Sequence, residues 1–335
     1  MKKLLLWLML MIVFLLVASV WWLNKDMHKQ LNNPLALSTE SVLKINSGQS
    51  LKFLAKDLVK KGWLPHPYYF IYEGRRQNIA SALKAGEYTI TEGTTPLRLL
   101  EILVEGKVKQ YSITIPEGWA FRQIIEAIKA NTQLVNTLSS FIPSTVMTEL
   151  NISDYAIEGR CFPDTYLFPA GTSDLDFLRR CVQTLDNILA EEWQKREAGL
   201  PYQSAYEALI MASIIEKETA RAEERKEIAG VFVRRLKLNM KLQTDPTVIY
   251  AMAENFDGNI RRKDLSIDSP YNTYRYKGLP PTPIASPGRE AIYAALHPQV
   301  GTALYFVAKG DGSHQFSDTL SKHNKAVVKY QLKKR

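Results

Sequence analysis

A charge-free apolar segment near the N-terminus constrains this chain more than any other feature. Residues 4–23 contain no Asp, Glu, Lys or Arg, and a helix of about 20 apolar residues crosses the hydrocarbon core of a bilayer. Lys2 and Lys3 precede the segment, which favours a cytoplasmic N-terminus. Trp21 and Trp22 close it like an interfacial belt, whereas a cleavable signal peptide has a shorter apolar core and small residues at its cleavage site. We therefore expect an uncleaved single-pass anchor, with the following residues outside the cytoplasm.

The net charge limits the kinds of binding partner that suit this chain, and the cysteine content bears on its redox compartment. The net charge of +9 is spread along the chain, and no nucleic-acid-binding motif accompanies it, so no nucleic-acid partner is expected. For an exported domain, this charge suits anionic phospholipid head groups or a carboxylate-rich polymer such as a cell wall. Cys161 and Cys181 are the only cysteines. An oxidising compartment permits a bridge between them, but two cysteines alone leave the pairing open.

After the anchor, a polar stretch leads into a region that repeats itself weakly. Residues 24–40 have few apolar side chains and are expected to form a linker. Residues 42–61, 87–104 and 111–129 each predict a short β-branched strand, a Gly-containing turn and an amphipathic helix. The first two units resemble the βααβ pattern of LysM-type wall-binding modules.

The rest of the chain predicts a mixture of helices, short strands and long loops. Strands are expected at 165–168, 304–308 and 314–316, and helices at 175–199, 228–238 and from 318 onward. Residues 265–288 are rich in Pro, Tyr and Asn. A loop of this length in a compact domain is usually functional or disordered, and its aromatic content favours an ordered cleft wall.

The predicted fold class is α+β, with an N-terminal transmembrane helix, a small LysM-like strand–helix module and a mixed α+β catalytic domain. The corresponding ranges are a cytoplasmic N-terminus at 1–3, a transmembrane anchor at 4–23, a linker at 24–40, the module at 41–110 and the catalytic domain at 111–335.

Two carboxylates lie in a helix predicted over the first half of residues 205–245. Apolar residues at helical spacing, with no Gly or Pro before Gly230, predict one helix through this stretch. Glu216 and Glu218 are two residues apart in it, so their side chains point to roughly opposite sides. Unselected helical Glu residues are usually solvated or paired with a nearby arginine.

The setting of Glu218 favours a different role. Met211, Ile214 and Ile215 precede it at helical spacing, and a helical side chain lies over the turn before it. Glu218 is therefore expected to lie across an apolar ridge. An apolar setting raises the pKa of a carboxyl, as a general acid requires. Glu216 follows Ala212 and Ser213 and is the reserve candidate.

Five further polar residues are candidate substrate contacts. Gln243, Thr244 and Asp245 lead into another predicted helix, and Asp245 before a proline is expected to be its N-cap whatever else it does. Asn272 lies in the long loop. Asp164 either serves the site or bonds its own turn. For each of the five, a structural role has about equal weight.

The sequence contains no motif for metal-dependent, nucleophilic or nucleotide-binding chemistry. The five histidines are scattered, without His-x-x-x-His or paired Cys, so no metal or cofactor is expected. Gly-x-Ser-x-Gly, Walker and Gly-x-Gly-x-x-Gly motifs are absent from the sequence. Acid–base chemistry by carboxylates remains, and glycoside cleavage needs one protonated carboxyl against the leaving oxygen.

Several motifs, in order along almost the whole chain, carry a resemblance to a known family. They are EG at 158–159, PDTY at 163–166, ASIIEKET at 212–219, QTDPTVIY at 243–250, YNTY at 271–274, GLPPTPI at 278–284, HP at 297–298, LYFVA at 304–308 and HN at 323–324. Together they resemble the YceG-like family of endolytic murein transglycosylases.

The resemblance implies a single-pass enzyme of the cell inner membrane with a periplasmic catalytic domain. It implies internal cleavage of nascent peptidoglycan strands that leaves 1,6-anhydro-N-acetylmuramoyl ends, with peptidoglycan synthases as partners. It places the catalytic acid at Glu218 and sugar contacts at Gln243, Thr244, Asp245 and Asn272.

Two other functions compete with this one. A muramidase would hydrolyse the same bond with water and a second acid such as Asp245 or Asp164. A wall-binding scaffold without activity would rely on the module at 41–110.

Overall fold

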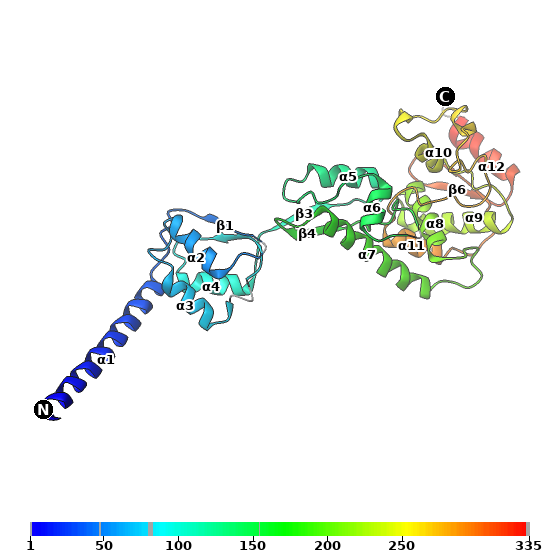
Figure 1. The fold of residues 1–335 in the computed structure, drawn as a ribbon. Helices are drawn as coiled ribbons and strands as arrows, with labels where there is room; N and C mark the ends of the chain where they lie inside the picture. The colour runs from blue at the N-terminus through cyan, green and yellow to red at the C-terminus, as the bar shows by residue number, and fades with distance from the viewer. Residues whose placement is uncertain (1, 47, 80–82, 154, 333–335) are drawn as a thin grey trace. The chain divides into compact units, whose positions relative to one another are not determined.

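The computed structural model of this chain describes residues 2–46, 48–79, 83–153 and 155–332. The predicted ranges that begin at residue 1 and end at residue 335 extend beyond these described residues. The fold is mixed α+β with an N-terminal apolar helix, as the sequence predicts (Figure 1). The chain divides into two compact units, Met1–Tyr111 with Phe168–Gly171, and Ser112–Leu167 with Thr172–Arg335.

The N-terminal helix α1 spans Lys2–Asn32. It is long and apolar enough to cross a membrane, and among the described residues no other helix meets that test. Helix α1 continues through 24–32, the first nine residues of the range expected to form a linker. Tyr69 Oη donates a hydrogen bond to Asp26 at 2.9 Å, and Leu31 is buried. These contacts pack the end of α1 against the first unit.

The described residues of the first unit form two strands and three further helices around one core. The elements are β1 (Ser41–Ile45), α2 (Leu51–Lys60), α3 (Tyr68–Arg76), β2 (Gly86–Ile90) and α4 (Pro96–Glu105). β1 and β2 pair antiparallel, with Leu43 opposite Tyr88, and both side chains are fully buried. Ser50 and Thr95 cap α2 and α4 through their hydroxyls. The strands and helices predicted within 42–61 and 87–104 are therefore confirmed, and α3 is a further helix between them.

The second unit carries the remaining elements. They are β3 (Gln110–Thr114, which begins in the first unit), α5 (Phe121–Ala130), α6 (Pro143–Glu149), β4 (Thr165–Pro169), α7 (Asp174–Gln194), α8 (Ala205–Glu218), α9 (Arg225–Lys237), α10 (Asp245–Met252), α11 (Arg289–Leu296), β5 (Tyr305–Ala308), β6 (His314–Ser317) and α12 (Leu320–Val327). β3 pairs with β4 and β5 with β6. The predicted hairpin and C-terminal helix are confirmed by β5, β6 and α12.

Helix α8 forms the centre of the second unit. It packs against α7, α9, α10 and α11, and eight consecutive residues from Ala208 to Ile215 are buried. The helix predicted over the first half of residues 205–245 is confirmed by α8, which ends at Glu218. Thr219 is extended (φ −145°, ψ 135°), and its hydroxyl accepts a hydrogen bond from the Arg221 amide at 3.0 Å. This β-branched residue favours the turn over another helical residue.

A disulfide joins Cys161 to Cys181, 20 residues further along the chain. It fixes the loop before β4 to the middle of α7, and both cysteines are buried. Closing a loop of this length in the unfolded chain stabilises the fold by about 3 kcal/mol. We expect the double variant Cys161→Ala/Cys181→Ala to lose about that much free energy of unfolding, measured by urea titration. An unchanged urea midpoint would contradict a stabilising role.

Candidate active site

Glu218 is the last residue of α8 and lies over a buried apolar surface. Met211, Ile214 and Ile215 beneath it are fully buried, as the helical spacing predicts. Its Oε1 accepts a hydrogen bond from Thr244 Oγ1 at 2.5 Å. Burial raises the pKa of the Glu218 carboxyl to about 7, the charge of Asp245 adds to the rise, and the Thr244 hydroxyl and Arg235 oppose it. The carboxyl therefore holds a proton up to neutral pH.

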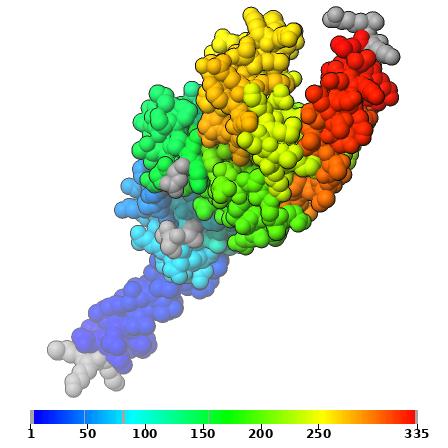
Figure 2. Space-filling view, turned by 90° about the vertical axis from the view of Figure 1, so that its right-hand side faces the viewer, coloured from blue at the N-terminus to red at the C-terminus, as the bar shows by residue number. Residues whose placement is uncertain are grey.

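The Glu218 carboxyl opens into a cavity of about 490 Å³. In the space-filling view, the yellow segment near residue 250 and the red C-terminal segment stand on either side of a hollow (Figure 2). Besides Glu218, the polar and aromatic lining includes Arg235, Gln243, Asp245, Tyr274, Tyr305, His314, His323 and Asn324. Hydroxyls, ring faces and amides of this kind suit a sugar ligand, which offers hydroxyl groups at its edges and apolar faces.

Gln243 and Asp245, on either side of the buried Thr244, line this cavity. Gln243 has a positive φ of 52°, a conformation that non-glycine residues adopt rarely. The expected N-cap at Asp245 is wrong, because Thr244 precedes the first helical residue, Asp245, and no side chain caps α10. The Asp245 carboxylate instead accepts a hydrogen bond from Tyr274 Oη at 2.5 Å. The Asp245 side chain therefore does not cap α10, and it lines the cavity.

Arg235 contributes a cation that the helical pattern does not reveal. The helical pattern of residues 228–238 predicts that Arg234 and Arg235 lie on the surface of the helix, but Arg235 is only 7% exposed. Its guanidinium donates to the carbonyls of Leu304 at 2.6 Å and Leu242 at 2.8 Å. Burial lowers the pKa of Arg235, and Glu218 opposes that fall. Arg235 thus ties α9 to the hairpin and places positive charge near Glu218.

Two histidines also line the cavity, although the scattered histidines gave no motif. His314 Nδ1 lies 2.6 Å from Glu224 Oε2. His323 stacks on the ring of Tyr305, with 5.3 Å between ring centroids. Burial lowers the pKa of His323, and Arg235 adds to the effect, so the ring is neutral near pH 7. Only their position on β6 and α12, which pack together, brings these histidines to the site.

Asn272 and Asp164 do not line this cavity. Asn272 is fully buried, and its amide donates to the carbonyls of Leu265 and Ile267 at 3.0 and 2.8 Å. Its Oδ1 accepts from the Tyr274 amide at 3.0 Å, so it holds the long loop and positions Tyr274. Asp164 accepts from the Thr165 amide within its own turn at 2.6 Å. Both residues have the structural role that the sequence left open.

Glu216 faces away from the cavity that Glu218 lines. Its Oε1 lies 3.2 Å from Arg225 Nη2, and its Oε2 accepts from the Gly288 amide at 2.9 Å. Burial raises the pKa of Glu216, while the Gly288 amide and Arg225 oppose the rise. The ion pair with Arg225 is the structural alternative considered for both acids, and it applies to Glu216.

Comparison with known proteins gives the family. The model of the YceG-like family matches residues 43–329, most of the chain. The chain belongs to the YceG-like family. Glu218 and every residue named in its cavity lie inside the matched region of this YceG-like chain.

Named relatives and a solved structure agree with this membership. A Bacillus subtilis protein named endolytic murein transglycosylase is 36% identical over 90% of this chain and 88% of its own length. A Streptococcus pneumoniae protein of the same name is 29% identical over 85% of this YceG-like chain, which matches 57% of that longer protein. The crystal structure of a yceG-like protein from Listeria monocytogenes is 31% identical, with a TM-score of 0.53 over 86% of this chain and 99% of that one.

Proposed function

We propose that this chain is an endolytic peptidoglycan lytic transglycosylase that uses Glu218 as its acid and base. The name shared by its Bacillus and Streptococcus relatives supports the reaction class. The single observation that carries the residue assignment is the raised pKa of Glu218, about 7, at the wall of a sugar-sized cavity. A carboxyl with that pKa donates a proton efficiently at neutral pH.

The proposed mechanism uses the Glu218 carboxyl twice. It first protonates the β-1,4 glycosidic oxygen between N-acetylmuramate and N-acetylglucosamine, and the bond to muramate C1 breaks. The resulting carboxylate then takes the proton from the muramate C6 hydroxyl, whose oxygen attacks C1 of the same sugar. The products are a 1,6-anhydromuramoyl end and a free N-acetylglucosamine hydroxyl, and Glu218 regains its proton. Water is not the nucleophile, so a second catalytic carboxylate is not required.

The neighbours of Glu218 would assist in different ways. Thr244 holds the carboxyl in place through its hydroxyl. Arg235 places positive charge nearby, which stabilises the carboxylate after proton transfer. Gln243 and Asp245 are proposed to contact sugar hydroxyls and amides at the cavity wall.

A muramidase is the second candidate function, and the position of Asp245 is the observation that favours it. Asp245 lines the same cavity as Glu218 and could activate a water, whereas Asp164 bonds its own turn. Mass spectrometry of strand ends released from isolated glycan by the full-length chain separates the two functions. Anhydromuramate ends support the transglycosylase, and reducing muramate ends, heavier by one water, support hydrolysis. No cleavage at all would favour a binding scaffold.

We also propose that α1 anchors the chain as a single-pass helix, with residues 1–3 in the cytoplasm and the catalytic domain outside it, in the periplasm of a cell with two membranes. The exposed apolar surface of α1 and the disulfide support this location. The range 41–110 is proposed to be a LysM-like wall-binding module, because β1, α2, α3 and β2 follow the βααβ order. Peptidoglycan synthases remain the proposed partners.

The rate of cleavage should depend on pH through Glu218. Because the acid must be protonated, kcat/KM should fall tenfold per pH unit above about 7. Thr244 lowers the pKa of Glu218, so Thr244→Val should move this fall to higher pH, while Thr244→Ser should leave it in place. The measurement is a pH–rate profile on isolated strands. A rate that stays constant from pH 6 to pH 9 would contradict the assignment.

A further inference from the structure

A second cavity lies on the other side of the wall that carries Glu218. It has a volume of about 680 Å³. Lys217, the neighbour of Glu218, lines this cavity, and Pro246, the neighbour of Asp245, lines it as well. Glu218 and Asp245 line the first cavity. Adjacent residues have Cα atoms only about 3.8 Å apart, so the end of α8 and the start of α10 separate the two cavities.

The second cavity differs from the first in chemistry. Its floor is apolar and is formed by Pro246, Ile249, Phe256 and Ile284. Among the described residues that line this cavity, there is no cluster of tyrosine and histidine side chains and no row of hydroxyl groups. A pyranose ring presents hydroxyls around its edge and suits the first cavity better. The second cavity suits a ligand with aliphatic groups.

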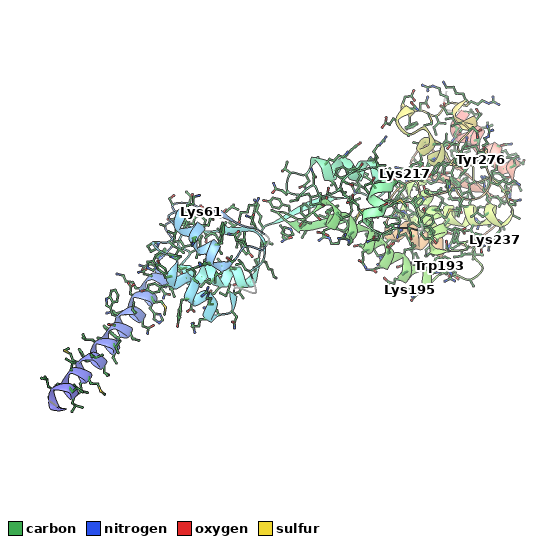
Figure 3. The ribbon with its side chains drawn as sticks, in the orientation of Figure 1. Lys61, Trp193, Lys195, Lys217, Lys237 and Tyr276 are labelled. Atoms are coloured by element: carbon green, nitrogen blue, oxygen red, sulfur yellow. A yellow bond between two sulfur atoms is a disulfide. The ribbon has the colours of Figure 1, made fainter. Side chains whose placement is uncertain are left out.

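Two cations stand at the edge of this apolar floor. Lys217 is exposed, and its ammonium group donates a hydrogen bond to the Gly118 carbonyl at 3.1 Å. In the view of Figure 3, its label lies between α5 and α10, the two helices that flank the cavity. Arg122 on α5 is 55% exposed and is 3.5 Å from Glu254, itself 84% exposed. Exposed pairs of this kind contribute little, so both cations remain available to a carboxylate.

The acid deeper in the cavity is already bonded to the protein. Glu158 Oε1 accepts from the amides of Phe121 at 2.8 Å and Gly159 at 3.1 Å. Its Oε2 accepts from Tyr250 Oη at 3.1 Å. Glu158 thus holds the start of α5 and the cavity wall through its own hydrogen bonds. Lys217 and Arg122 are the cations of this cavity, and the exposed Glu254 lies beside Arg122.

We propose that this second cavity binds the peptide that branches from a muramate residue of the glycan strand, with Lys217 and Arg122 pairing with its carboxylates. The inference rests on the proposed function, because it assumes that the strand lies in the Glu218 cavity. A muramate at that cavity carries its lactyl-linked peptide as the branch nearest the cut. Such a peptide combines aliphatic side chains with free carboxylates, which match the apolar floor and the two cations. The enzyme then selects peptide-bearing strands over bare glycan.

The test compares two substrates that differ only in the peptide. Full-length chain in detergent micelles is given uncrosslinked strands with their peptides, and the same strands after an amidase has removed them. We expect wild-type kcat/KM to be about tenfold higher on peptide-bearing strands, through a lower KM. The double variant Lys217→Gln/Arg122→Gln should bring the ratio close to one and leave cleavage of bare strands unchanged. Lys237→Gln, an exposed change on α9 outside both cavities, is the matched control.

Two outcomes would overturn the inference. One is a wild-type ratio that the double variant does not change. The other is an equal loss on both substrates in a variant that circular dichroism shows to be folded. If the wild-type chain cuts neither substrate, the proposed function fails. Binding of a free peptide then tests separately whether the second cavity is a peptide site. For that purpose, the free peptide L-alanyl-γ-D-glutamyl-L-lysine is titrated into the Glu218→Gln chain by NMR. Binding that the double variant loses supports the cavity, and no binding contradicts it.

Discussion

Replacing Glu218 with Gln is expected to lower the turnover of glycan strands by about a thousandfold, within the range typical of a lost general acid. Gln keeps the size of the side chain and can still accept the hydrogen bond from Thr244 Oγ1. It cannot donate a proton to the glycosidic oxygen or remove one from the C6 hydroxyl. The loss should therefore appear in kcat, with little change in KM. The measurement is release of muramoyl ends over time from isolated strands.

The matched control is Glu223→Gln, the same substitution at a carboxylate that is 69% exposed and pairs loosely with Arg221. It should retain wild-type turnover.

The stability of Glu218→Gln gives a second control. Because burial raises the pKa of Glu218 from 4.5 to about 7, this residue lowers the free energy of unfolding as the pH rises from about 4.5 to about 7, and the full penalty remains at higher pH. Glu218→Gln should therefore be at least as stable as wild type at pH 8. An inactive but unfolded variant would carry no information on catalysis, and an active folded one would refute the assignment.

Replacing Arg225 with Ala is expected to lower the free energy of unfolding by about 3 kcal/mol at pH 8. The side chains of Arg225 and Glu216 are only 10% and 6% exposed. Removing the guanidinium leaves the Glu216 carboxylate buried with the Gly288 amide as its remaining partner. The loss should be smaller at pH 5, because Glu216, whose pKa burial already raises, then takes up a proton instead. Urea titration at the two pH values measures both effects.

Two comparisons make this prediction specific to the buried pair. Arg261→Ala removes an arginine that pairs with Asp257 where both side chains are about half exposed, and it should change stability by less than about 1 kcal/mol. The double variant Arg225→Met/Glu216→Leu removes both charges and should recover part of the loss. A loss equal to that of Arg261→Ala would show that the buried pair does not stabilise the end of α8.

The sequence predicts the elements well where local patterns decide them. Apolar periodicity and capping residues such as Ser50 and Thr95 define the helices and strands of the first unit. The same periodicity predicts the buried ridge beneath Glu218, because every residue of that ridge belongs to one helix. The end of α8 is not predicted, since the turn after Glu218 depends on the hydrogen bond between Thr219 and Arg221.

The site is predicted only in part because it draws on distant segments. Helical spacing assigns Arg235 to a solvent face, but carbonyls of the hairpin and of the segment before α10 surround its guanidinium. His314 and His323 have no spacing in common, and the packing of α12 against β6 places both at the cavity. The role of Asp245 follows from Tyr274, which is 29 residues away. Contacts of this kind arise from tertiary structure and leave no local pattern.

Titration of the Glu218 carboxyl tests the central claim most directly. Full-length chain in detergent micelles, carrying ¹³C-labelled glutamate, is followed by NMR from pH 4 to pH 9, and the Glu218→Gln variant identifies the resonance. We expect the Glu218 carboxyl to titrate at about 7, against an ordinary value of 4.5. A midpoint near 4.5 would mean that the carboxyl is ionised throughout the neutral range, and Glu218 could not then be the proton donor.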